Sequence, residues 1–176
     1  YQDATFRLLQ TFDLEPNYNV TLLSLWDKRT LLCCSRWQGL LLLDLNTGKC
    51  RRPPFDCGKE IMNIFIDSQK RIWVAPYNGG LNCLTRDGKL LATYTTRNSY
   101  LSNNVVLSLA EREGQIWIGT DGGGINSFDQ KTNTFHHYPT TYGEKVTSIT
   151  DFSENELLLS CFNKGVFTFN KRTAQM

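Results

Sequence analysis

Short apolar runs alternate with polar turns along the whole chain, and the same pattern returns four times. The ten residues Ile116–Ile125, IWIGTDGGGI, align with Ile72–Leu81, Leu31–Leu40 and Leu157–Val166. Each copy ends in a glycine followed by an aliphatic residue, and these glycines are spaced by 41, 44 and 41 residues: Gly39, Gly80, Gly124 and Gly165. No segment of a dozen residues has its apolar positions at helical spacing. The pattern therefore predicts a repeated unit made of short strands.

Each unit predicts four strands, which we call A to D, with a polar turn between A and B, a glycine-bearing loop between B and C, and a polar turn between C and D. A period of 40 to 45 residues with four strands is typical of a propeller blade. The B strands are apolar nearly throughout, as expected when neighbouring blades cover both faces. We expect an all-β fold: a β-propeller of about four blades of four antiparallel strands, with units at 20–60, 61–104, 105–145 and 146–176.

The two ends of the chain leave the closure of the ring open. Thr5–Phe12, TFRLLQTF, resembles the D strand at Thr134–Tyr138, so residues 1–19 are predicted to hold the outer strand of a preceding or closing blade. The chain stops at Met176, where the fourth D strand should begin. That first strand could complete the last blade and close a four-bladed ring, or the four blades could be part of a larger ring. The larger ring is favoured because this repeat type usually forms one. An incomplete ring exposes two apolar faces, which predicts self-association or a homodimer.

Charge and cysteine usage narrow the function classes. The formal net charge of +2 does not favour a nucleic acid as partner, and no apolar run approaches the roughly 20 residues that span a bilayer. The six cysteines have no metal-site spacing with histidine and are expected to be buried thiols, with Cys33 and Cys34 on opposite faces of one strand. A disulfide between Cys50 and Cys57, across RRPPFD, is left open as an alternative.

The third unit carries a family resemblance. GQIWIGTDGGGINSFDQKTNTFHHY, which begins at Gly114, resembles the two-component regulator propeller repeat, whose pattern is roughly G-x-[IL]-W-[IV]-G-T-x-x-G-G-[IL]-x-x-[FY]-D followed by T-x-x-F-x-x-Y. The second unit matches through IWVAPYNGGL, and the other two have Leu32 and Leu158 in place of tryptophan. We assign a structural role to Trp73 and Trp117 and to the four repeat glycines.

The resemblance implies a setting for the chain. In that family the repeats form the extracytoplasmic, periplasmic sensor of hybrid two-component proteins, followed by a membrane helix, a histidine kinase and a response regulator. The implied ligands are oligosaccharides from polysaccharides that the cell degrades, and the receptors are implied to be dimers. The chain would then sense a ligand without spanning the membrane itself. A non-catalytic scaffold or dimerisation element is the alternative, followed by a propeller polysaccharide lyase or hydrolase.

No convincing catalytic, cofactor or metal motif is present, so we expect a non-enzyme without a cofactor. His136 and His137 are neighbours in a D strand and therefore face opposite ways. The glycine run at Gly122–Gly124 leads into a strand, whereas a phosphate loop opens a helix. Asp129 is expected to cap its own turn.

Ligand contacts are instead predicted at the end of the propeller where the B–C and D–A loops meet. These loops combine aromatic rings, which stack on sugar rings, with amides and charges that bind hydroxyls. The opposite end holds ordinary turns such as DSQK, EREG and SENE. The candidate residues are Arg36, Trp37, Tyr77, Asn78, Tyr100, Asn103, Asp121, Phe162, Asn163 and Lys164.

Overall fold

The computed structural model describes residues 10–58, 60–141 and 143–176, which form four antiparallel sheets. We name them blades 1 to 4 in chain order. In each blade the strands pair in the order of the sequence, so each blade is a meander. The strands are β1 (Leu22–Asp27), β2 (Thr30–Ser35), β3 (Gly39–Asp44) and β4 (Cys50–Arg51) in blade 1; β5 (Ile61–Ile66), β6 (Ile72–Pro76), β7 (Leu81–Leu84) and β8 (Leu90–Tyr94) in blade 2; β9 (Val106–Arg112), β10 (Gln115–Thr120), β11 (Ile125–Asp129) and β12 (Thr134–His137) in blade 3; and β13 (Val146–Asp151), β14 (Glu156–Cys161) and β15 (Gly165–Asn170) in blade 4.

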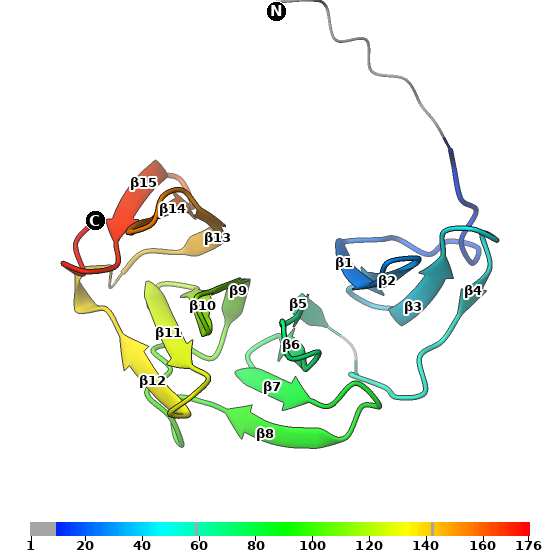
Figure 1. The fold of residues 1–176 in the computed structure, drawn as a ribbon, viewed down its shortest axis with the longest axis horizontal. Helices are drawn as coiled ribbons and strands as arrows, with labels where there is room; N and C mark the ends of the chain where they lie inside the picture. The colour runs from blue at the N-terminus through cyan, green and yellow to red at the C-terminus, as the bar shows by residue number, and fades with distance from the viewer. Residues whose placement is uncertain (1–9, 59, 142) are drawn as a thin grey trace, which may run out of the picture.

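The blades follow one another around an arc (Figure 1). The first strand of each blade, β1, β5, β9 or β13, lies innermost and contacts the first strand of the next blade. Blades 1 and 4 stand at the two ends of the arc, and no buried cluster among the described residues joins them. The predicted all-β propeller is therefore confirmed. A single short 3₁₀ turn, η1 (Pro139–Thr141), interrupts the strands within the described ranges.

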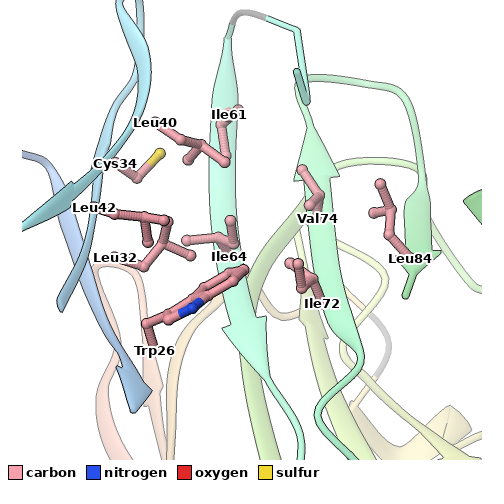
Figure 2. Close-up of a cluster of buried hydrophobic side chains, with 10 residues drawn as sticks. All are labelled: Trp26, Leu32, Cys34, Leu40, Leu42, Ile61, Ile64, Ile72, Val74 and Leu84. Carbon is pink, nitrogen blue, oxygen red and sulfur yellow. The ribbon is translucent and has the colours of Figure 1, made fainter. Parts of the chain in front are cut away.

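Three apolar clusters hold neighbouring blades together, because the second strand of blades 1, 2 and 3 carries apolar side chains on both faces. Figure 2 shows the first cluster, where Leu32 and Leu42 of blade 1 meet Ile64 of blade 2. The second cluster buries Trp73 and the third buries Trp117, so each repeat tryptophan lies between its own blade and the next one. Burial of apolar surface on both faces is the main favourable term in a fold of this kind.

The repeat glycines mark the start of the third strand because the backbone there needs a positive φ. Gly39, Gly80, Gly124 and Gly165 have φ values of 76°, 74°, 69° and 97°. A Cβ at Gly80 would lie 2.1 Å from the carbonyl oxygen of Tyr94, and one at Gly124 would lie 2.2 Å from that of Thr141. The crowding atoms belong to the chain that leaves the same blade, and only these two of the four positions are crowded.

Short capping turns follow the third strand at matching positions of the repeat in blades 1, 3 and 4. The Asp129 carboxylate accepts hydrogen bonds from the backbone N–H groups of Lys131 and Thr132, at 2.8 and 3.1 Å, as the sequence predicts. Asp44 and Asn170 accept the same pair of bonds in blades 1 and 4. These bonds favour the charged form and lower the pKa of Asp44 and Asp129.

The outer face of blade 1 is partly covered by the segment that precedes β1. Tyr18 is buried there, and its single hydroxyl donor lies within hydrogen-bond distance of two carbonyl oxygens, those of Cys33 and Gly39, at 2.9 and 2.6 Å. Burial raises the pKa of this hydroxyl. Leu23 and Leu25 of β1 remain exposed beside it. The strand predicted over Thr5–Phe12 falls mostly on residues 1–9, which lie outside the described residues.

The cysteines behave as small apolar side chains. All six thiols are free, and Cys33 and Cys34 point into different clusters on the two faces of β2, as predicted. Cys57 packs in the cluster between blades 1 and 2, whereas Cys50 packs on the outer face of blade 1. The alternative of a Cys50–Cys57 disulfide is therefore wrong, because the two side chains lie on opposite sides of the sheet.

Candidate functional site

The predicted loop residues of blades 3 and 4 form one connected group. Asp121 pairs with Lys145 at 3.0 Å, and the Lys145 ammonium lies 5.1 Å from the centre of the Phe162 ring. The Asn103 side-chain amide donates to the carbonyl oxygen of Asp121 at 2.7 Å. Lys164 pairs with Glu144 at 2.6 Å. These charged groups already have partners within the protein, so they hold the loops in place as well as offering polar atoms to solvent.

A second group lies on the loops of blades 1 and 2. The Arg36 guanidinium stacks over the Trp37 ring at 5.1 Å. Glu60 links the two loops through its backbone, since its N–H donates to the carbonyl oxygen of Arg36 and its carbonyl oxygen accepts from the N–H of Tyr77. Trp37 and Tyr77 expose 57% and 54% of their surface. Asn78, beside Tyr77, has a positive φ of 53°.

Tyr100 belongs to neither group and lies in a groove on the outer rim between blades 2 and 3, which we call the rim groove. It is the most exposed of the large apolar side chains in the described part of the chain, at 80%. The groove has a volume of about 680 Å³. It is lined by the end of β8, the loop after it, and β12 with its preceding turn: Tyr94, Asn98, Ser99, Tyr100 and Asn133–His137.

Aromatic rings form the base of the rim groove. The ring centre of Tyr94 lies 5.3 Å from that of Phe128 and 4.9 Å from that of Phe135. The Asn98 side chain is used within its own loop, where it accepts from the N–H of Thr95 and donates to the carbonyl oxygen of Thr93. It therefore fixes the loop that presents Tyr100.

The polar groups of the rim groove are amides, hydroxyls and imidazoles. No Asp, Glu, Lys or Arg is among the residues that line it. The two histidines lie on opposite sides of β12, as predicted: His137 Nε2 is 3.2 Å from the carbonyl oxygen of Gly123, whereas His136 is exposed. A groove with an aromatic base and neutral hydrogen-bonding groups suits a neutral ligand that has both apolar faces and hydroxyls.

Sequence reasoning found the loop residues but missed most of this groove. Tyr94 and Phe135 were visible as aromatic positions of outer strands, and their meeting across two blades depends on the angle between those blades. Glu144, the partner of Lys164, was not predicted, and neither was the pairing of Asp121 with Lys145. Among the described residues no group of His, Cys, Asp and Glu side chains is placed to hold a metal ion. No helix within the described ranges is long and apolar enough to cross a membrane.

Comparison with known proteins gives one family match, which covers a short part of the chain. Residues 100–122 match the two component regulator propeller family. A search of curated proteins finds no match. Among solved structures, the extracellular domain of a putative one component system from B. thetaiotaomicron has a TM-score of 0.76 at 19% identity, over 94% of this chain and 23% of its own.

Two further structures share the fold. The extracellular domain of a putative hybrid two component system from B. thetaiotaomicron has a TM-score of 0.67 at 24% identity, over 87% of this chain and 21% of its own. The computationally designed Ika4 protein has a TM-score of 0.69 at 15% identity, over 93% of this chain and 99% of its own. The chain thus spans less than a quarter of the two extracellular domains but nearly all of the designed protein. The match to the two-component regulator propeller family covers Tyr100 to Gly122, mostly within the third of the four repeats, and the blades on either side have the same repeated strand pattern.

Proposed function

We propose that the chain is part of the ligand-sensing propeller of an extracytoplasmic receptor in a hybrid two-component system, and that its ligand is a neutral oligosaccharide. The family and the two extracellular domains of similar fold support the setting. The observation that carries the ligand class is the rim groove, which combines an exposed Tyr100 with a lining that has no Asp, Glu, Lys or Arg. Aromatic rings stack on the apolar faces of sugars, and neutral amides and hydroxyls bind sugar hydroxyls without the cost of burying an unpaired charge.

Isothermal titration of the receptor with a panel of neutral oligosaccharides tests this proposal. Tyr100→Ala removes the exposed ring of the rim groove, and Tyr77→Ala is the control, because it removes another exposed tyrosine, from the loop face. We expect Tyr100→Ala to weaken binding about five- to tenfold. Weakening by Tyr77→Ala alone would move the ligand to the loop face. Absence of binding to any neutral oligosaccharide would refute the ligand class.

A second candidate function is a non-catalytic scaffold that brings two copies of the chain together. Leu23 and Leu25 favour it, since both side chains are exposed on the outer face of blade 1, at 61% and 67%. Exposed apolar side chains side by side on a sheet are typical of an interface. Light scattering of the Leu23→Ser/Leu25→Ser variant tests this function. A dimer that becomes a monomer in the variant supports the scaffold, and a parent chain that is monomeric at high concentration argues against it.

A further inference from the structure

A small polar cavity lies between blades 3 and 4, at the end of the propeller opposite to the predicted loop face. It is formed by the turn between β9 and β10, the turn between β13 and β14, and the residues after β15. Its volume is about 300 Å³. The lining residues are Arg112, Glu113, Gln115, Trp117, Tyr138, Glu154, Asn155, Lys171 and Arg172.

The equivalent place between blades 2 and 3 holds a buried carboxylate. Trp73 of β6 lies opposite Phe65 of β5, and Asp67 follows two residues later along the chain. The Trp73 indole N–H donates to the Asp67 carboxylate at 2.9 Å. The same carboxylate accepts from Arg71 Nε at 2.7 Å, and the Asp67 side chain is fully buried. The indole N–H of this blade is therefore satisfied by an acidic residue of the chain itself.

Blade 3 places a basic residue at this position. Trp117 of β10 lies opposite Ala110 of β9, and the residue two positions after Ala110 is Arg112. Trp117 is 2% exposed, and its indole Nε1 is buried without a hydrogen-bond partner. Where blade 2 has a donor facing an acceptor, blade 3 has a donor next to a second donor.

Two further nitrogens in this cavity are also buried and make no hydrogen bond: Arg112 Nε and Lys171 Nζ. The Glu113 carboxylate stands 3.5 Å from Arg112 Nε and 3.7 Å from Lys171 Nζ, but its side chain is 58% exposed. Asp151 meets the other end of the Arg112 guanidinium at 3.2 Å. Three buried N–H donors without a hydrogen-bonded acceptor are costly, because each loses its water on folding.

We propose that this cavity binds the carboxylate of a small organic acid, which takes the place that the Asp67 side chain holds in blade 2. One carboxylate offers about four acceptor positions, enough for the donors of Trp117, Arg112 and Lys171. Charge-assisted bonds from arginine and lysine favour an anion over a neutral group. The lining carries three cationic side chains and two carboxylates. The exposed Glu113 is the carboxylate that the ligand must displace. The Tyr138 ring, stacked on Trp117 at 5.5 Å, is the wall for the body of the ligand.

The indole N–H signal of Trp117 in a ¹⁵N–¹H spectrum gives a direct test. Trp117→Phe identifies the signal, and the probes are sodium acetate and sodium glucuronate, with glucose and sodium chloride as controls at matched ionic strength. We expect either carboxylate to shift the Trp117 signal to saturation and to leave the Trp73 signal in place. No shift, or an equal shift with chloride or glucose, overturns the proposal and leaves water as the occupant.

Two variants separate binding from folding. Arg112→Asp supplies the carboxylate that blade 2 has, so we expect the Trp117 signal to move without ligand and to stop responding to acetate. Lys171→Gln keeps the size of the side chain but removes the charge, and it should weaken carboxylate binding roughly tenfold. Lys131→Gln, an exposed residue at the same end of the propeller, is the control and should bind as the parent does. Unchanged affinity in Lys171→Gln would contradict the site even if Arg112→Asp fails to fold.

Discussion

The interface between blades 2 and 3 and the interface between blades 3 and 4 bury the same repeat tryptophan in different surroundings. Trp73 donates to Asp67 and packs against Tyr94 and Phe128. Trp117 packs against Tyr138 and Phe169 in much the same way, but its indole N–H has no hydrogen-bond partner. The aromatic packing of the repeat tryptophan is thus the same at both interfaces, but its indole N–H has a hydrogen-bond partner only between blades 2 and 3. The difference shows that repeat residues fix the packing of blades, while residues outside the repeat decide whether the polar atoms are satisfied.

A polar network reinforces this difference. Beyond Asp67, the Arg71 guanidinium donates to the Gln130 side chain of blade 3, and Gln130 donates to Glu111 at 2.7 Å. Glu111 in turn accepts from the Ser68 hydroxyl and backbone N–H of blade 2. The chain of hydrogen bonds crosses from blade 2 to blade 3 and back. At the next interface the ion pairs of Arg112 and Arg172 involve half-exposed or exposed carboxylates, which contribute little to stability.

Removing the Asp67 carboxylate, between blades 2 and 3, should have the largest effect on stability. Asp67→Ala leaves the Arg71 guanidinium and the Trp73 indole without their buried acceptor, so we expect the free energy of unfolding to fall by about 3–5 kcal/mol. Urea denaturation measures this change. Glu154→Ala at the second interface removes an exposed partner of Arg172 and should cost less than about 0.5 kcal/mol. Equal losses in the two variants would show that the network does not stabilise the interface.

Replacing the repeat glycine by alanine should destabilise blade 3 more than blade 4. Alanine at Gly165 meets only the cost of a positive φ, about 1–2 kcal/mol, because no atom lies within 4 Å of its Cβ. Alanine at Gly124 carries the same cost and also places its Cβ 2.2 Å from the carbonyl oxygen of Thr141. We therefore expect Gly124→Ala to lower the thermal midpoint further than Gly165→Ala. The opposite order would mean that the segment at Thr141 moves aside freely.

Replacing each tryptophan by phenylalanine isolates the indole N–H. Trp73→Phe deprives Asp67 of one donor, whereas Trp117→Phe removes a donor that has no partner. Both variants lose a similar amount of ring, so the difference between them reports the polar group alone. We expect Trp73→Phe to be less stable than Trp117→Phe by about 1–2 kcal/mol in urea denaturation. A difference near zero would indicate that the Trp73–Asp67 hydrogen bond contributes no net stability.

Acid should weaken the capping turns at Asp44 in blade 1 and at Asp129 in blade 3, and we expect this loss of stability to be the smallest of the effects. The pKa of Asp44 and of Asp129 is lowered in the folded chain, so the stabilisation is present above about pH 4, the ordinary pKa of aspartate, and is lost as the pH falls further. Asp129→Asn can still accept the turn hydrogen bonds but does not titrate. We expect a shallower decline of the thermal midpoint between pH 5 and pH 3 in this variant. An unchanged decline would assign the acid sensitivity to other carboxylates.

Features that recur in every repeat could be predicted from the sequence. The spacing of Gly39, Gly80, Gly124 and Gly165 predicted the four sheets and the position of the third strand, because a positive φ in the same loop requires the same residue each time. The turn at Asp129 was predictable for a similar reason, since the capping bonds join residues two and three positions apart.

Features made by two different blades could not be predicted in this way. The rim groove needs Tyr94 and Phe135, which lie far apart in the sequence and meet only through the angle between blades 2 and 3. Asp67 and Arg112 occupy matching places only because Ala110 and its partner Trp117 are one residue closer in the sequence than Phe65 and its partner Trp73, which shifts the alignment that the glycines suggest. The loop residues chosen from the sequence remain a prediction as ligand contacts, and their division into two groups and an isolated Tyr100 follows from contacts that the sequence does not contain.

The loop after β10 has a mechanical consequence. Gly122 and Gly124 are hydrogen-bonded through their backbones to Gly143 and Glu144, and Asp121 forms an isolated β-bridge with Lys145. The segment that leads into blade 4 is therefore held along the loop of blade 3 by backbone hydrogen bonds. These bonds join the loop of blade 3 directly to the segment that precedes the innermost strand of blade 4, so tilting one blade against the other would have to stretch or break them.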